Sequence, residues 1–110
     1  MNKILNEEML SELKLIMEDE FGDLMHTFLV ESERQFHNAQ SAWDGGDFAK
    51  LRLSAHSLKG SCANVGAEQL QQTCAVLESQ AKAGIGDGVP ELLDQVSAQL
   101  HDVHGVIEAL

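Results

Sequence analysis

The sequence predicts an all-α fold, namely an antiparallel up-and-down four-helix bundle with a short additional helix at its N-terminal end. Strand signals are nearly absent, because the chain has no Tyr and few β-branched residues. Apolar residues instead recur every three or four positions, which is the spacing of amphipathic helices. The connections between these stretches are short, and short connections favour antiparallel neighbours. At 110 residues the chain has room for one domain, which we expect to span residues 1–110.

Five helices are expected, and most of their ends have a recognisable chemical signal. Gly45-Gly46 can adopt the positive φ that ends a helix, and Asp47 can cap the helix that follows. Glycines near 66 and 84–86 mark two further ends, and Pro90 suits the first turn of the last helix. The predicted helices cover residues 6–17, 20–43, 47–64, 67–82 and 90–110.

The apolar stripe of each predicted helix defines the side that faces the core. On the third helix it contains Phe48, Leu51, Ala55, Leu58, Cys62 and Val65. The stripe of the first helix contains Met9, Leu10, Leu13, Ile16 and Met17, and that of the last contains Leu92, Val96, Leu100, Val103, Ile107 and Leu110. Four histidines project away from the apolar stripe of their own helix and are expected in solvent: His26 and His37 on the second helix, and His101 and His104 on the last.

The charge balance limits the classes of partner. With 18 acidic and 7 basic residues, the chain carries a net charge of −11, so nucleic acid and anionic membrane surfaces would repel it. The first residues lack the apolar stretch of a signal peptide, and no later run is long enough to span a bilayer. We therefore expect a cytoplasmic protein that binds neither nucleic acid nor membrane.

Metal binding is not expected. Cys62 and Cys74 lie within apolar helical patterns and outside any Cys-x-x-Cys motif, so they are interpreted as buried reduced thiols. A four-helix bundle that holds paired metals would need two inward Glu-x-x-His motifs, whereas the chain offers only an outward Asp23-x-x-His26.

The third helix carries the candidate site. His56 lies well over a right angle from the centre of the apolar stripe, so its imidazole should be exposed, and a neutral imidazole is a good nucleophile near pH 7. Lys59, one turn on, can neutralise part of the charge of a phosphorylated ring, and Gly60 leaves room for the backbone of a partner. Small or apolar residues that could form a docking surface surround the histidine: Ala49, Leu53 and Ala63.

The run Ala55 to Ala67, AHSLKGSCANVGA, resembles the signature of histidine-containing phosphotransfer (HPt) domains, which is His-x-Leu-Lys-Gly followed by small residues and a later Gly. The helix lengths and the segment Leu77-Glu78-x-x-Ala81-Lys82 extend the resemblance over nearly the whole chain, as in a stand-alone bacterial HPt protein of a multistep two-component phosphorelay. The resemblance implies that His56 is phosphorylated on Nε2, that Lys59 contacts the phosphoryl group and that Gly60 gives access.

In the HPt family a polar side chain of the neighbouring helix often bonds the other ring nitrogen. Gln71, Glu78 and Lys82 share one flank of the fourth helix, and we expect Glu78 to take this role, with Arg52, Gln71 and Lys82 as further support near the phosphoryl group.

The resemblance also implies the function and the partners. A phosphoryl group would pass from an aspartate on the receiver domain of a hybrid sensor kinase to the histidine, and from there to the aspartate of a response regulator. Mg²⁺ would belong to the receivers, and the chain itself would need no cofactor. It has no phosphate-cradling loop, so we expect a carrier and not an ATP-hydrolysing enzyme. A monomer is expected, because the docking face must stay open.

Two other kinds of histidine-bearing bundle and one short motif give alternative interpretations. The dimerisation domain of a histidine kinase normally has an acid directly after the histidine, where this chain has Ser57, and a proline a few residues on, where it has Gly60-Ser61. A degenerate adaptor that binds receivers without carrying phosphate remains open. Gly45-Gly46-Asp47-Phe48 resembles part of the signature of cyclic-dinucleotide synthases, but its residues suit a helix stop and start.

Overall fold

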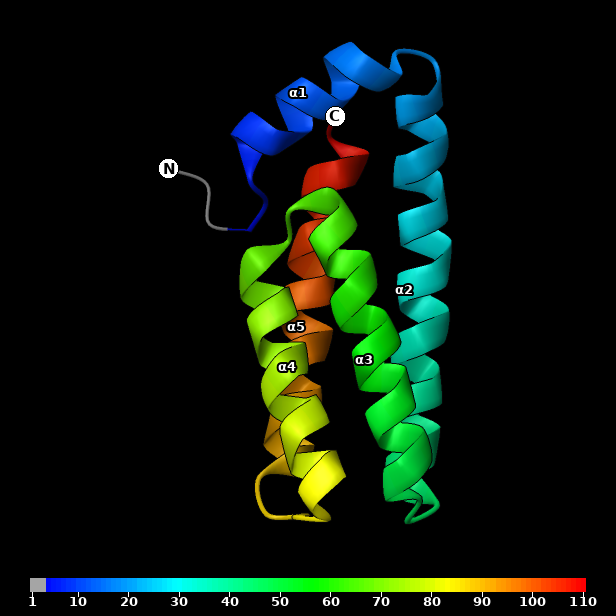
Figure 1. Ribbon diagram of the computed structural model, residues 1–110, viewed down its shortest axis with the longest axis vertical. Coiled ribbons are helices and arrows are strands. Elements are labelled where there is room, and N and C mark those ends of the chain that lie inside the picture. The colour runs from blue at the N-terminus through cyan, green and yellow to red at the C-terminus, as the bar shows by residue number, and fades with distance from the viewer. Residues whose placement is uncertain (1–3) are drawn as a thin grey trace.

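The computed structural model describes residues 4–110, and these residues form five α-helices and no strand. The helices are α1 (Glu7–Met17), α2 (Glu20–Asp44), α3 (Phe48–Val65), α4 (Glu68–Ala83) and α5 (Val89–Glu108). Helices α2 to α5 run up and down as an elongated bundle, and α1 lies across the end at which α5 terminates (Figure 1). The predicted fold class is confirmed, and every predicted helix boundary lies within two residues of the observed one.

The helix ends follow the chemistry of the turns. Gly46, between α2 and α3, has a φ of 69°, and the Asp47 carboxylate then accepts a hydrogen bond of 3.0 Å from the Lys50 amide. The Gly-Gly-Asp-Phe segment is therefore a helix stop followed by a helix start. At the other end of α3, Gly66 adopts a left-handed conformation with a φ of 72°, which costs a glycine no steric penalty.

Asn6 attaches α1 to the bundle. Its side chain accepts a hydrogen bond from the Met9 amide and donates one of 2.9 Å to Glu68 at the start of α4. Its backbone amide also donates to the Gly66 carbonyl at 2.9 Å. A Cβ at position 66 would come within 2.9 Å of the Asn6 Cβ, so this contact requires glycine as well. The short first helix is thus fixed to the turn between α3 and α4.

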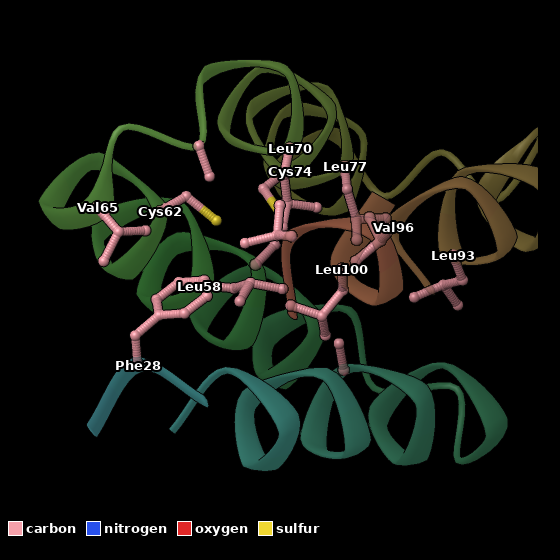
Figure 2. Close-up of a cluster of buried hydrophobic side chains, with 14 of the residues drawn as sticks. Phe28, Leu58, Cys62, Val65, Leu70, Cys74, Leu77, Leu93, Val96 and Leu100 are labelled. Atoms are coloured by element: carbon pink, nitrogen blue, oxygen red, sulfur yellow. The ribbon is translucent and has the colours of Figure 1, made fainter. Parts of the chain in front are cut away.

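The core lies between α2, α3, α4 and α5, with each of these helices packed on two others. Figure 2 shows apolar side chains of all four helices meeting there, including Phe28, Leu58, Leu77 and Leu100. Cys62 and Cys74 are fully buried free thiols, as predicted. A hydrogen bond with the Cys74 thiol, together with burial, raises the pKa of the Cys62 thiol, so Cys62 stays protonated.

Two predicted core positions, Ile16 and Leu110, are wrong. Ile16 is 79% exposed, because α1 lies across one end of the bundle and buries a narrower stripe than a bundle helix does. Leu110 is 63% exposed, because α5 ends at Glu108 and helical spacing no longer applies beyond it. On α5, Leu93 is buried in the core, whereas Leu92 is only partly buried at its edge.

One of the four histidines expected in solvent is largely buried instead. His26, His37 and His101 are exposed, but the His104 side chain is only 15% exposed. A hydrogen bond of 2.9 Å joins its Nε2 to the Oγ of Ser32, which is fully buried on α2, and its ring meets Phe28 edge-on. Position 104 borders the apolar stripe of α5, and α2 packs over that border. The prediction for His104 is therefore wrong.

Candidate functional site

The buried face of α3 determines which way His56 points. Leu51, Ala55, Leu58 and Cys62 are almost completely buried, as predicted, so the opposite side of the helix faces solvent. The His56 side chain lies on that side and is 64% exposed. A group on another protein can therefore reach the imidazole without any rearrangement of the core.

Helix α4 supplies a carboxylate that contacts both His56 and Lys59. The Nδ1 atom of His56 lies 2.8 Å from Oε2 of Glu78, and the Nζ atom of Lys59 lies 2.6 Å from Oε1 of the same residue. The hydrogen bond from Lys59 is the largest cause that lowers the pKa of Glu78, and the hydrogen bond from His56 adds to it, while burial acts in the opposite direction. Glu78 is therefore ionised near neutral pH.

This contact defines the chemistry of the ring. A carboxylate bonded to one nitrogen of a neutral imidazole favours the tautomer in which that nitrogen carries the proton. Nδ1 then donates to Glu78, and Nε2 keeps its lone pair. Within residues 4–110, no hydrogen bond engages Nε2. The arrangement presents an exposed nucleophilic nitrogen with a cation one turn away.

The surface around the histidine is open. A Cβ built at Gly60 would meet no other atom within 4 Å, so this mid-helix glycine is not required for packing within the chain. Leu53 is 58% exposed, and Ala49 and Ala63 are exposed as well. An exposed leucine with small neighbours leaves α3 accessible to a second surface.

The structure brings His56, Lys59 and Glu78 together but not all of the predicted supporting residues. In the described part of the chain, no hydrogen bond or ion pair joins Arg52, Gln71 or Lys82 to the ring. Arg52 lies one turn before His56 on α3, and Lys82 lies one turn after Glu78 on α4. Because the two helices are antiparallel, Arg52 and Lys82 lie opposite each other, and both line one groove. Gln71 lies on α4 beyond Glu78 in the other direction and is half-buried.

Neither a metal site nor a membrane-spanning helix is found among the described residues. Over residues 4–110, no three His, Cys, Asp or Glu side chains stand where they could hold a metal ion together. The helices in the same range also include none with the length and apolar character that crossing a membrane requires.

Comparison with known proteins decides the family. The family model of the Hpt domain matches residues 23–106, which include α3, α4 and all three residues of the site. The chain belongs to the Hpt domain family. The resemblance of the Ala55–Ala67 run to the HPt signature is thereby confirmed. Hpt domains carry phosphoryl groups in two-component signalling and interact with receiver domains.

Two relatives support this assignment. The crystal structure of histidine-containing phosphotransfer protein B (HptB) from Pseudomonas aeruginosa PAO1 is similar to this Hpt domain with a TM-score of 0.93 and 33% sequence identity, over 96% of this chain and 92% of that one. Histidine-containing phosphotransfer protein 1 of rice, Oryza sativa subsp. japonica, is 31% identical over 64 residues. That match covers 58% of this chain and 44% of the rice protein, so the chain spans less than half of that relative.

Some features of the surface were missed by the sequence interpretation. Lys50 lines a second groove, between α2 and α3, that also contains Leu53. Phe48 and Gly84 line the groove that holds Arg52 and Lys82. The sequence did contain a signal for this second pair of residues. Gly84 marks the end of α4, and an antiparallel hairpin places the end of α4 beside the start of α3, where Phe48 lies.

Proposed function

We propose that this Hpt domain is a reversible phosphoryl carrier that uses His56. It accepts the group from an aspartyl phosphate on the receiver domain of a hybrid sensor kinase and passes it to the aspartate of a response regulator. The observation that supports this best is the bond between Nδ1 of the exposed His56 and the Glu78 carboxylate, 2.8 Å long, because it leaves Nε2 as the nucleophile.

The transfer is a balanced in-line displacement. The lone pair of Nε2 attacks phosphorus, the bond between phosphorus and the aspartyl oxygen breaks, and the aspartate leaves as a carboxylate. The phosphorylated ring keeps its proton on Nδ1 and bears a positive charge, which the Glu78 carboxylate balances. The reverse sequence of bonds returns the group to another aspartate.

Lys59 supports the phosphoryl group in this proposal. Its Nζ atom, now 2.6 Å from Glu78, is one turn from the ring and can turn toward the phosphoryl oxygens. A charge pair at about 4 Å contributes on the order of 1 kcal/mol in water and about 4 kcal/mol at an effective dielectric constant near 20. Release of Lys59 from Glu78 therefore requires only a modest competing charge.

The remaining assignments complete the proposal. Gly60 gives the receiver access, and Ala49, Leu53 and Ala63 form its docking surface. Arg52, Gln71 and Lys82 border the site. Residues 1–110 act as one cytoplasmic, monomeric domain that uses no cofactor of its own, and Mg²⁺ is held by the receiver. The domain carries the group without hydrolysing ATP.

The decisive experiment is labelling by purified phosphorylated receiver domains. The wild type should acquire an acid-labile, base-stable label, as expected for a phosphoramidate, and His56→Gln should fold but stay unlabelled. His101→Gln, which changes an exposed histidine of α5, is the matched control and should be labelled like the wild type. Label that persists in His56→Gln would contradict the site. A wild type that binds receivers and is never labelled would identify an adaptor without phosphotransfer.

A further inference from the structure

Positive charge is concentrated on two helices of this acidic protein. Four of the seven basic residues, Lys50, Arg52, Lys59 and Lys82, lie on α3 and α4. These helices contain only two of the 18 acidic residues, Glu68 and Glu78. The other 16 acidic residues are distributed over the rest of the chain with three basic ones. The helices that carry the site are therefore net positive within a chain of net charge −11.

Most of this positive charge has no partner within the protein. Lys59 is paired with Glu78. Over residues 4–110, no carboxylate lies within ion-pair distance of Lys50, Arg52 or Lys82, and all three side chains are exposed. Their charge is thus available to another molecule.

These cations border apolar surface on one side of His56. Leu53 lines both a groove of about 500 Å³ between α3 and α4 and a second groove between α2 and α3. Arg52 and Lys82 line the first groove, together with Phe48, Ala49 and Ala81, and Lys50 lines the second. On the other side of His56, toward Gly66, the cation of α3 is Lys59, which is paired with Glu78, and the uncharged Ala63 and Gln71 lie about two turns from His56 and Glu78.

We propose that Lys50, Arg52, Leu53 and Lys82 form a docking surface that selects acidic receiver domains and sets the direction of their footprint. The inference rests on the proposed function and deepens it. The receiver covers His56 with its neighbours Gly60 and Ala63, and from there its footprint extends along α3 and α4 toward Asp47 and Gly84. An apolar side chain of the receiver lies against Leu53, and its carboxylates face Arg52 and Lys82.

Charge complementarity supports this occupant and this direction. An acidic partner is repelled by the 16 acidic residues outside α3 and α4 and is attracted to the one net-positive face. Complementary charges at the rim of an interface act mainly on the association rate and on the choice of partner. Arg52 and Lys82 are therefore specificity-determining residues, and they act before the phosphoryl group moves.

The test measures binding separately from transfer. The receiver is chosen from a panel of purified receiver domains as the one that, when phosphorylated, labels the wild type fastest. The binding probe is the unphosphorylated form of that receiver. We compare the double variant Arg52→Glu/Lys82→Glu with Lys14→Glu, a single charge reversal on α1 outside this surface. The double variant should bind about tenfold more weakly at low salt, with the difference shrinking as ionic strength rises, and Lys14→Glu should stay within about twofold of the wild type.

The apolar contribution to receiver binding is tested separately from the contribution of the charges. Leu53→Ala should weaken binding at every ionic strength, because it removes apolar contact and no charge. Thermal melts check that each variant is folded, and the neutral pair Arg52→Gln/Lys82→Gln replaces the charge reversal if that variant does not fold.

The outcomes distinguish the two proposals. If a receiver labels the wild type but binds the double variant or its neutral replacement as tightly as the wild type, the docking surface is wrong and the carrier function stands. If Lys14→Glu weakens binding as much per reversed charge as the double variant does, the effect is one of net charge, and the proposed surface is again wrong. If no receiver labels the wild type, the proposed function fails and this inference fails with it.

Discussion

Glu78 Oε2 lies 2.8 Å from Nδ1 of His56, while the other oxygen of the same carboxylate lies 2.6 Å from Nζ of Lys59. One acidic residue of α4 therefore contacts both the ring and the nearby cation. A neutral amide at position 78 could accept the hydrogen bond from Nδ1, but it could not balance the positive charge of a phosphorylated ring. The hydrogen bond and the charge can thus be tested separately.

Substitution of Glu78 should slow phosphotransfer in a defined order. Glu78→Gln keeps an oxygen acceptor for Nδ1 and should be slower than the wild type, while Glu78→Ala removes both acceptor and charge and should be slower still. Loss of an orienting partner typically reduces activity by about 10–100-fold, which we expect for the alanine variant. Single-turnover transfer from a phosphorylated receiver measures both. Equal rates for the glutamine and alanine variants would mean that the hydrogen bond does not orient the ring.

Lys59→Ala should separate stability from transfer. The Lys59 and Glu78 side chains are partly buried, at 31% and 22% exposed, and an ion pair that water still reaches contributes about 0–1 kcal/mol to stability, so the melting temperature should change little. Transfer should slow in both directions, because the phosphoryl group loses its nearby cation. Lys14→Ala on α1 is the matched control and should transfer at the wild-type rate. Wild-type kinetics in Lys59→Ala would show that Lys59 is only a solvated cation beside Glu78.

The same variant should change the titration of Glu78. A hydrogen bond from Lys59 is the main cause of the lowered pKa of Glu78, so Lys59→Ala should raise that pKa toward its ordinary value. Because the folded-state pKa is lowered, the pair stabilises the wild type above the ordinary carboxyl pKa and ceases to do so as the pH falls through the folded-state value. NMR titration of the Glu78 carboxyl carbon measures the change. If the pKa of Glu78 is the same in Lys59→Ala and in the wild type, Lys59 does not contact Glu78 in solution.

Helical spacing predicted the bundle and the exposed His56, because both depend on the direction of side chains around a single helix. It did not predict the outward position of Ile16 or the burial of His104, because each depends on how one helix lies against another. Glu78 was expected to contact His56 only through the resemblance to the HPt family. The observed contact is consistent with that expectation, but its role in transfer remains a prediction. Unpaired cations could not be identified from sequence at all, since pairing depends on distances between helices.

His104 should make the stability of the fold sensitive to acid. Burial is the main cause that lowers the pKa of His104, against the opposing charges of Glu33 and Glu108 and with a small contribution from His101. The unfolded chain then binds a proton at a higher pH than the folded chain does, so the free energy of unfolding falls as the pH drops below the ordinary histidine pKa. Urea unfolding at pH 7.5 and 5.5 should show a larger loss in the wild type than in His104→Gln.

His26→Gln is the control for that measurement, because it removes an exposed histidine that is not among the causes of the lowered pKa of His104. It should keep the dependence of the wild type on pH. If His104→Gln loses as much stability as the wild type between the two pH values, the protonation of other groups accounts for the acid sensitivity.

Gly60 should affect stability and transfer in opposite directions. A Cβ at this position would meet nothing within 4 Å, so Gly60→Ala should stabilise the isolated domain by about 0.4–1 kcal/mol through loss of unfolded-state entropy. Gly60→Gln should fold comparably well, but its side chain would occupy the space through which a receiver brings aspartate and imidazole into line. Misplacement of reacting groups by about an ångström is expected to slow transfer by at least about tenfold.

Gly105 offers a matched comparison on α5, because it is also a mid-helix glycine whose added Cβ would meet nothing within 4 Å. Gly105→Ala should stabilise the domain by a similar amount, and Gly105→Gln should leave transfer unchanged, since position 105 lies outside the surface around His56. Thermal melts and single-turnover kinetics measure the two properties on the same samples. A strongly destabilised Gly60→Ala would mean that position 60 is packed within the chain, and a normal transfer rate in Gly60→Gln would mean that the receiver approaches His56 from another side.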